Sequence, residues 1–94
     1  MFIDDFIWLP ATIDKIEVKH GLTPEEVEEI FFNQPKFRKV EDGFCKGEDV
    51  FAATGQTDVG KYLVVFFIRK KNNIALIISA RVMDKSERRR HGKK

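Results

Sequence analysis

Two nearly uninterrupted apolar runs limit most strongly what this chain can fold into. They read KYLVVFFIR at residues 61–69 and IALIISAR at residues 74–81, and the polar segment KKNN separates them. Strands with so few polar positions are typical of the centre of a sheet, where both faces are at least partly covered. The short link has the composition of a turn. The sequence therefore predicts a hairpin at the centre of a sheet.

Two weaker strand patterns precede this hairpin. KFRKV at residues 36–40 alternates Phe37 with charged side chains, and DVFAAT at residues 49–54 follows a loop that contains glycine. The segment GQTDVG at residues 55–60 lacks the lysine and the strand-to-helix context of a phosphate-binding loop, so we interpret it as a hairpin turn. The short links between these strands predict a four-stranded, mainly antiparallel sheet.

Two helices are predicted before the strands, following the short extended piece FIWLP. Pro10 suits the first turn of a helix that runs to about His20. Thr23 and Glu26 form a capping box that opens the second helix. The acidic run EEVEE is interpreted mainly as a favourable helix start with a solvated face, and a partner-binding surface is the alternative.

A third helix is predicted at the C-terminus, because Asp84 and Glu87 repeat the capping pattern after the last strand. The element order is then two helices, four strands and one helix, which predicts an α+β fold. The length of 94 residues fits a single domain that spans residues 1–94.

Charge is distributed unevenly along the chain. Residues 1–50 carry 12 acidic and 6 basic side chains, whereas residues 81–94 carry 2 acidic and 7 basic ones. A basic end on an otherwise acidic small domain favours nucleic acid or an acidic partner. A solvated basic tail without a specific role is the alternative.

The sequence also bounds the cellular compartment. Its one cysteine, Cys45, cannot form an intrachain disulfide and is interpreted as an incidental free thiol in a reducing compartment. No apolar run is long enough to span a bilayer, and Asp4 and Asp5 stand where a signal peptide needs positive charge. We expect a cytoplasmic protein that does not contact membranes.

Few side chains could carry chemistry. With His20 and His91 as the only histidines, we expect neither a metal cluster nor a cofactor. Lys19 and His20 end the first helix, where the helix dipole favours positive charge. His20 could therefore be functional, a capping residue or a half-buried packing residue.

Arg81 ends a strand that is predicted to be buried, and such a charge is costly unless it is paired. Two interpretations are open. Glu87 on the following helix could form a structural ion pair with it. Alternatively, Arg81 could hold a phosphate through the planar fork of its donors.

Short motifs follow one another over nearly the whole chain. The order is a tryptophan, a proline, K-H-G at a helix end, E-E-x-x-x-x-F, G-E, G-x-T, G-K, I-S-A-R and E-R. In this sequence the matching residues are Trp8, Pro10, Lys19, His20, Gly21, Glu25 to Phe31, Gly47, Glu48, Gly55, Thr57, Gly60, Lys61, Ile78 to Arg81, Glu87 and Arg88. In this pattern the chain resembles the BrnT-type toxins of bacterial toxin–antitoxin systems.

The resemblance implies a RelE-like fold and a metal-independent endoribonuclease that cleaves RNA and arrests translation. It also implies neutralisation by a small antitoxin of the BrnA kind, which carries a DNA-binding domain and represses its own operon in the complex. A dimer within such a complex is compatible with this expectation. No cofactor is implied.

The resemblance also implies residue roles. His20 would be the acid or base, since its ordinary pKa of about 6.5 lies near neutrality. Lys19 and Arg81 would hold the phosphate. Glu87 would position Arg81 or act as a base, and Arg88 would orient the substrate or add positive field. Further RNA contacts are expected from Lys61, Arg89 and Arg90. These roles require the K-H-G motif to lie near the end of the last strand.

The sequence also departs from the family pattern. Val50, Gln56 and Lys61 stand where many members carry arginine. This motivates a second hypothesis, a binding module without catalysis whose exposed sheet or acidic helix docks an antitoxin-like partner while the basic tail contacts nucleic acid. A DNA-binding repressor is a third and weaker hypothesis, because no helix-turn-helix spacing precedes SERRRHGKK.

Overall fold

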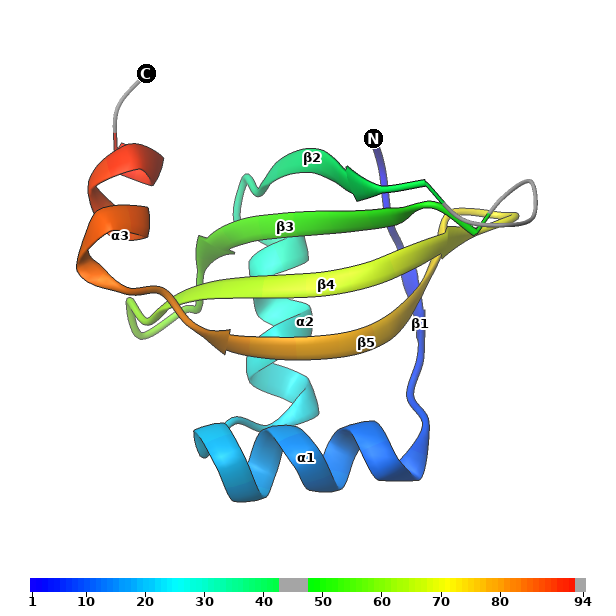
Figure 1. Ribbon diagram of the computed structural model, residues 1–94, viewed down its shortest axis with the longest axis horizontal. Coiled ribbons are helices and arrows are strands. Elements are labelled where there is room, and N and C mark those ends of the chain that lie inside the picture. Colours follow the sequence, from blue (N-terminus) through cyan, green and yellow to red (C-terminus); the bar gives the residue numbers. More distant parts are fainter. Residues whose placement is uncertain (43–47, 93–94) are drawn as a thin grey trace.

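The computed structural model describes residues 1–42 and 48–92. Five strands form one sheet in the order β1-β5-β4-β3-β2 (Figure 1). The elements along the chain are β1 (Asp5–Ile7), α1 (Pro10–His20), α2 (Pro24–Phe32), β2 (Lys36–Glu41), β3 (Val50–Gln56), β4 (Tyr62–Lys70), β5 (Ile74–Val82) and α3 (Lys85–Gly92). Cys45 and Gly47 lie outside the described residues, so the predictions that concern them stay predictions.

The fifth strand corrects the prediction of four. The FIWLP segment was expected only as an extended piece, but residues 5–7 pair with β5 in parallel, from Asp5 opposite Ile74 to Ile7 opposite Leu76. The other strand pairs are antiparallel, and the α+β class and the three predicted helices are confirmed. The error concerns the edge of the sheet and leaves the central hairpin unchanged.

The start of α2 and the end of α1 lie at the residues that the sequence predicted for them. The capping box of α2 is complete, because Thr23 Oγ1 accepts from the Glu26 backbone N–H at 3.2 Å while Glu26 Oε1 accepts from the Thr23 N–H at 3.1 Å. Gly21 ends α1 with a φ of 63°, a left-handed conformation that glycine adopts without strain. Local chemistry therefore sets the ends of both N-terminal helices.

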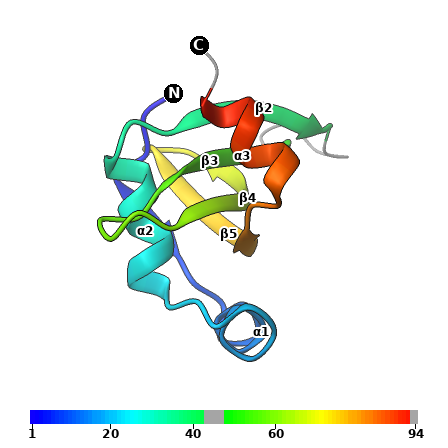
Figure 2. The same cartoon turned by 90° about the vertical axis from the view of Figure 1, so that its left-hand side faces the viewer.

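The main core lies on the sheet face that contacts α2, called here the α2 face (Figure 2). Phe31 of α2 and Phe67 of β4 pack edge to face at 5.4 Å, and Phe37 of β2 joins them. Ile30 lies so close to β3 that a Cβ added at Gly55 would meet the Ile30 Cβ at 3.3 Å. A glycine at that position lets α2 approach the sheet.

Strand β5 contains one extra residue, Ile78, which forms a β-bulge. Ile77 pairs with Phe67 and Ser79 pairs with Phe66, so Ile78 has no partner on β4. The Ile78 carbonyl instead accepts a hydrogen bond from Lys15 Nζ of α1 at 3.0 Å. Side chains on a strand alternate between faces, and the extra residue shifts that alternation by one position.

The bulge decides the face on which Arg81 lies. Before the bulge, Ile77 faces the α2 core; after it, Ala80 does, and Arg81 lies opposite Val64 on the other face. We call this opposite side the α3 face, because α3 lies over it (Figure 2). It holds a smaller apolar cluster, formed by Ala52, Tyr62, Val64, Phe66 and Met83.

The acidic face of α2 is used within the protein. Glu28 Oε2 accepts from the Trp8 indole N–H at 2.8 Å, and Glu29 Oε1 accepts from the Asp58 backbone N–H at 3.0 Å. Glu26 forms an ion pair with Lys61 at 2.7 Å. In the part of the chain that the structure describes, no helix has the length and apolar character needed to cross a bilayer.

Candidate functional site

Helix α3 begins with the capping box that the sequence predicts. The Glu87 backbone N–H donates to Asp84 Oδ1 at 2.7 Å, and the Asp84 N–H donates to Glu87 Oε1 at 2.9 Å. Within its range, Lys85–Gly92, no residue is buried. Polar contacts and ring contacts must therefore hold this helix against the sheet.

The strongest of these contacts joins Arg81 to Glu87. The two terminal nitrogens of Arg81 donate to the two carboxylate oxygens of Glu87 at 2.6 and 2.7 Å. This bidentate geometry fixes the guanidinium plane. The hydrogen bonds from Arg81 lower the pKa of Glu87 to about 2, and the same contact raises the pKa of Arg81. Of the two interpretations of Arg81, the ion pair is therefore present in the structure. A direct phosphate contact by Arg81 stays a prediction.

The C-terminal half of α3 contacts strands β2, β3 and β4. The Lys36 Nζ donates to the His91 carbonyl at 2.5 Å, and the His91 Nδ1 lies 3.2 Å from the Thr54 Oγ1. The Arg88 guanidinium lies 4.7 Å from the centre of the Tyr62 ring, within the range of a cation–π interaction. These contacts leave a hollow between α3 and β2.

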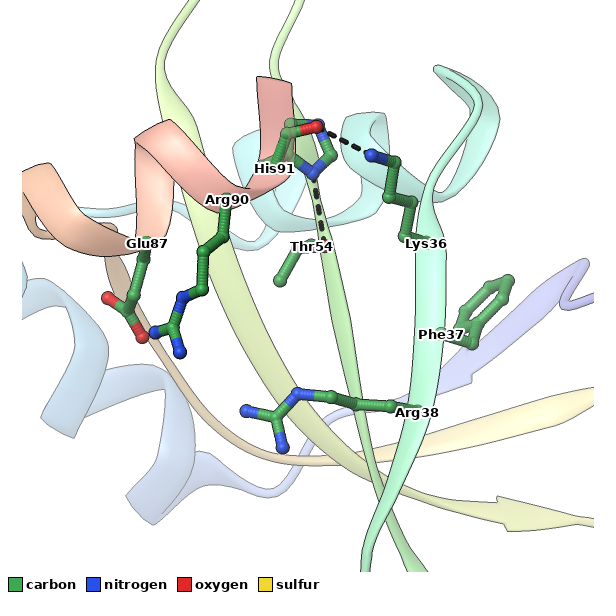
Figure 3. A pocket seen from close by; sticks show the side chains of 7 residues that line it. All are labelled: Lys36, Phe37, Arg38, Thr54, Glu87, Arg90 and His91. Atoms are coloured by element: carbon green, nitrogen blue, oxygen red, sulfur yellow. Dashed lines mark hydrogen bonds between the residues drawn. The ribbon is translucent and has the colours of Figure 1, made fainter. Parts of the chain in front are cut away.

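This hollow is a pocket of about 440 Å³, and it is the candidate site. Its lining residues are Lys36, Phe37, Arg38, Thr54, Glu87, Arg90 and His91. Figure 3 shows Arg38 and Arg90 extending into it from opposite walls, while Phe37 points away. Burial and the nearby Lys36 lower the pKa of His91, which favours the neutral imidazole. Three permanent cations and one carboxylate give the pocket an excess of positive charge.

Lys19 and His20 lie apart from this pocket. Both are exposed at the end of α1, so the prediction that His20 is a half-buried packing residue is wrong. The end of α1 and helix α3 lie at the same end of the molecule, with the end of β5 between them (Figures 1 and 2). Within residues 1–42 and 48–92, no hydrogen bond or ion pair joins either residue to Arg81 or Glu87. Their catalytic roles stay predictions.

The three predicted RNA-binding residues fall in three places. Arg90 lines the pocket, and Arg89 lines a shallower hollow of about 350 Å³ together with Tyr62, Lys85 and Arg88. Lys61 instead forms the ion pair with Glu26 of α2 at 2.7 Å. The two arginines of α3 are therefore better placed for a shared ligand than Lys61 is.

Five residues of the pocket were not among the predicted site residues, and three of them, Lys36, Arg38 and His91, carry ionisable side chains. Lys36 and Arg38 alternate with Phe37, and this alternation indicated only that they face away from the core. His91 lies at the end of a short helix, and nothing local indicated that its ring contacts β3. A metal-binding group of three or more histidine, cysteine or acidic side chains is not found among the described residues.

Comparisons with known proteins agree with the order of these elements. The model of a family described as "Ribonuclease toxin, BrnT, of type II toxin-antitoxin system" matches residues 8–87. A crystal structure of the Brucella abortus ribonuclease toxin, BrnT, shares the fold with a TM-score of 0.69 at 20% sequence identity, covering 87% of this chain and 100% of that one. No protein with a curated description matches the sequence. Arg90 and His91 lie beyond the residues that the family model matches.

Proposed function

Because this chain belongs to the BrnT family of ribonuclease toxins of type II toxin–antitoxin systems, we propose that it is a metal-independent endoribonuclease that cleaves RNA and thereby inhibits translation in the cytoplasm. The observation that carries this proposal is the gathering of arginines around two hollows beside α3, with Arg38 and Arg90 in one and Arg88 in the other. Cations on a face that is not covered by α1 or α2 suit the phosphates of an RNA strand.

The proposed reaction is attack of a ribose 2′-hydroxyl on the adjacent phosphate. It needs a base, an acid and stabilisation of the charge on the phosphate. His20 is the proposed acid or base and Lys19 a phosphate contact, since they end α1, and the ends of α1 and of β5, the strand of Arg81, lie at the same end of the molecule (Figure 1). With a pKa of about 2, Glu87 is a weak base, so its proposed role is to position Arg81. Arg88 adds positive field beside Tyr62.

The test is cleavage of RNA by the purified protein in EDTA. We expect cleavage to persist without metal and to fall strongly in His20→Ala, Arg81→Ala and Arg88→Ala. Arg69→Ala is the matched control, because Arg69 is an exposed arginine at the opposite end of β4. Equal cleavage by the native protein and Arg81→Ala would remove Arg81 from the mechanism, and no cleavage by the native protein would refute the proposal.

A binding module without catalysis is the second candidate. The observation that favours it is that both terminal nitrogens of Arg81 already bind Glu87. Such a module would bind RNA with a steep salt dependence and leave it intact. Growth arrest on expression of the protein alone, relieved by Arg81→Ala or His20→Ala, would exclude this candidate.

The family implies an antitoxin partner. We propose a BrnA-like antitoxin with a DNA-binding domain, and a dimer within the toxin–antitoxin complex. The open part of the sheet suits such a partner better than α2 does, because Glu26, Glu28 and Glu29 are already bound within the protein. Co-expression with the product of the neighbouring reading frame, followed by purification, tests this partner. Failure of the two proteins to associate would contradict it.

A further inference from the structure

We propose that the pocket between β2 and α3 binds a phosphate group of an RNA strand through Arg38 and Arg90. The inference rests on the proposed function, because it names a contact for the same substrate. It adds Arg38, which was not among the predicted site residues, and it places the expected RNA contact Arg90, which lies beyond the matched residues 8–87, in the same pocket.

The first support is the geometry of the two guanidinium groups. Arg38 lies on β2 opposite Ala52 of β3, and this small side chain leaves space above the sheet. Arg90 reaches the same space from α3 (Figure 3). In the described part of the chain neither guanidinium has a hydrogen bond or an ion pair, so their N–H donors are available to phosphate oxygens.

The second support is the charge and size of the pocket. The carboxylate of Glu87 is already compensated by Arg81, with which it forms two hydrogen bonds. Lys36 adds positive charge while its Nζ holds the His91 carbonyl. A volume of about 440 Å³ lies within the range of roughly 300–1,000 Å³ that is typical of ligand pockets, and it leaves room for a phosphate with its ribose.

The third support separates an RNA strand from a free phosphate ion. The shallower hollow lined by Lys85, Arg88 and Arg89 lies on the same helix as Arg90. Two neighbouring basic hollows suit a ligand that carries several phosphates in a row, which is the property of a nucleic-acid backbone. A single inorganic phosphate would use only one of them.

The test is binding of a short, labelled 2′-O-methyl RNA, which cannot be cleaved by attack of its own 2′-oxygen. Affinity is measured by fluorescence anisotropy at several salt concentrations. Each phosphate contact on a single strand contributes about 0.7 to the slope of log K against log salt. Because both arginines contact one phosphate, we expect Arg38→Ala and Arg90→Ala each to weaken binding and to reduce the slope by at most about 0.7, whereas Arg69→Ala leaves the slope unchanged. Circular dichroism checks that each variant is folded.

The outcomes separate this inference from the proposed nuclease activity. If Arg38→Ala and Arg90→Ala retain the native slope, the pocket does not bind RNA, whether or not unmodified RNA is cleaved. If the two variants show the expected reductions in slope on 2′-O-methyl RNA but the native protein cleaves no unmodified RNA, the assignment of the pocket stands and the nuclease proposal fails. If inorganic phosphate competes for both arginine sites as effectively as the RNA does, the assignment to RNA is overturned.

Discussion

Helices α2 and α3 begin in the same way but are attached to the sheet by different interactions. Each opens with a capping box whose glutamate also binds a cation near a strand end: Glu26 binds Lys61 at 2.7 Å, and Glu87 binds Arg81 at 2.6 Å. Beyond this first turn the two helices differ, because α2 buries Val27, Ile30 and Phe31 whereas none of residues 85–92 of α3 is buried.

The two helices can therefore lose different contacts without detaching from the sheet. Burial of a large apolar side chain contributes about 1.5–3 kcal/mol, so α2 is held by its core residues even without its ion pair. A hydrogen bond contributes about 0.5–1.5 kcal/mol net, and somewhat more when a charge is involved. Helix α3 is held by a few such contacts, and these same residues line the candidate site. Its attachment should therefore respond to single substitutions, to pH and to salt.

Truncating a buried side chain of α2 should lower the stability of the protein most. Ile30→Ala removes a fully buried side chain between α2 and the sheet, and we expect the free energy of unfolding to fall by about 2–5 kcal/mol. Denaturant unfolding measures it. Val18→Ala is the control, because Val18 is 83% exposed on α1 and its truncation should change stability by less than about 0.5 kcal/mol. A similar loss in both variants would contradict the role given to Ile30.

The next effect is on α3. Glu87→Ala removes the ion pair and the capping hydrogen bond that the Asp84 N–H donates to the Glu87 carboxylate, so we expect the α3 amides to exchange with solvent much faster, corresponding to about 1–3 kcal/mol of lost local stability. Hydrogen exchange measures it amide by amide. In the matched variant Glu26→Ala, the amides of α2 should stay protected by the buried residues. If amide exchange increased more in α2 of Glu26→Ala than in α3 of Glu87→Ala, the claim that α2 is the more firmly attached helix would be wrong.

Acid should weaken the attachment of α3 to the sheet over a defined range of pH. Hydrogen bonds from Arg81 lower the pKa of Glu87 in the folded protein to about 2, below the ordinary value of 4.5. Its contribution to stability is therefore complete above about pH 4.5 and is lost as the pH falls toward 2. The Tyr62 ring resonances, which sense Arg88 and His91, should shift over that window. Glu87→Gln should abolish this pH dependence, and its persistence there would assign it to another group.

The smallest expected effect concerns His91. Burial lowers its pKa and the positive charge of Lys36 lowers it further, so Lys36→Met should raise the pKa of His91. A pH titration of the imidazole by NMR measures the change. Lys71→Met, at the turn between β4 and β5, removes the same charge at the other end of the sheet and should leave the His91 pKa unchanged (Figure 1). A fall in the pKa of His91 in Lys36→Met would show that the lysine acts mainly by other means.

Elements with local signals could be predicted from the sequence, and elements that depend on distant partners could not. The capping residues and the apolar hairpin act on their own neighbours, so their patterns led directly to α2, α3, β4 and β5. Strand β1 has three residues, and its pairing of Asp5 with Ile74 joins distant parts of the chain. No periodicity can be recognised over so short a segment, which is why it was predicted only as an extended piece.

The candidate site shows the same division. The cost of burying an unpaired charge was enough to predict the ion pair of Arg81 with Glu87 as one of two alternatives. The alternation of Phe37 with charged side chains predicted a strand at residues 36–40 but gave Arg38 no role. That Arg38 meets Arg90 and His91 depends on where α3 lies over the sheet, and no residue pattern encodes that position locally.

The extra residue Ile78 shifts the alternation of side chains along β5 by one position. If β5 kept this residue but paired with β4 without the bulge, its last residues would exchange sides. Ala80 would turn outward and Arg81 would enter the phenylalanine core, where it could not reach Glu87. The Lys15 hydrogen bond to the carbonyl of Ile78 marks the place of this shift. The way in which β5 accommodates this one residue therefore decides on which side of the protein the Arg81 cation lies.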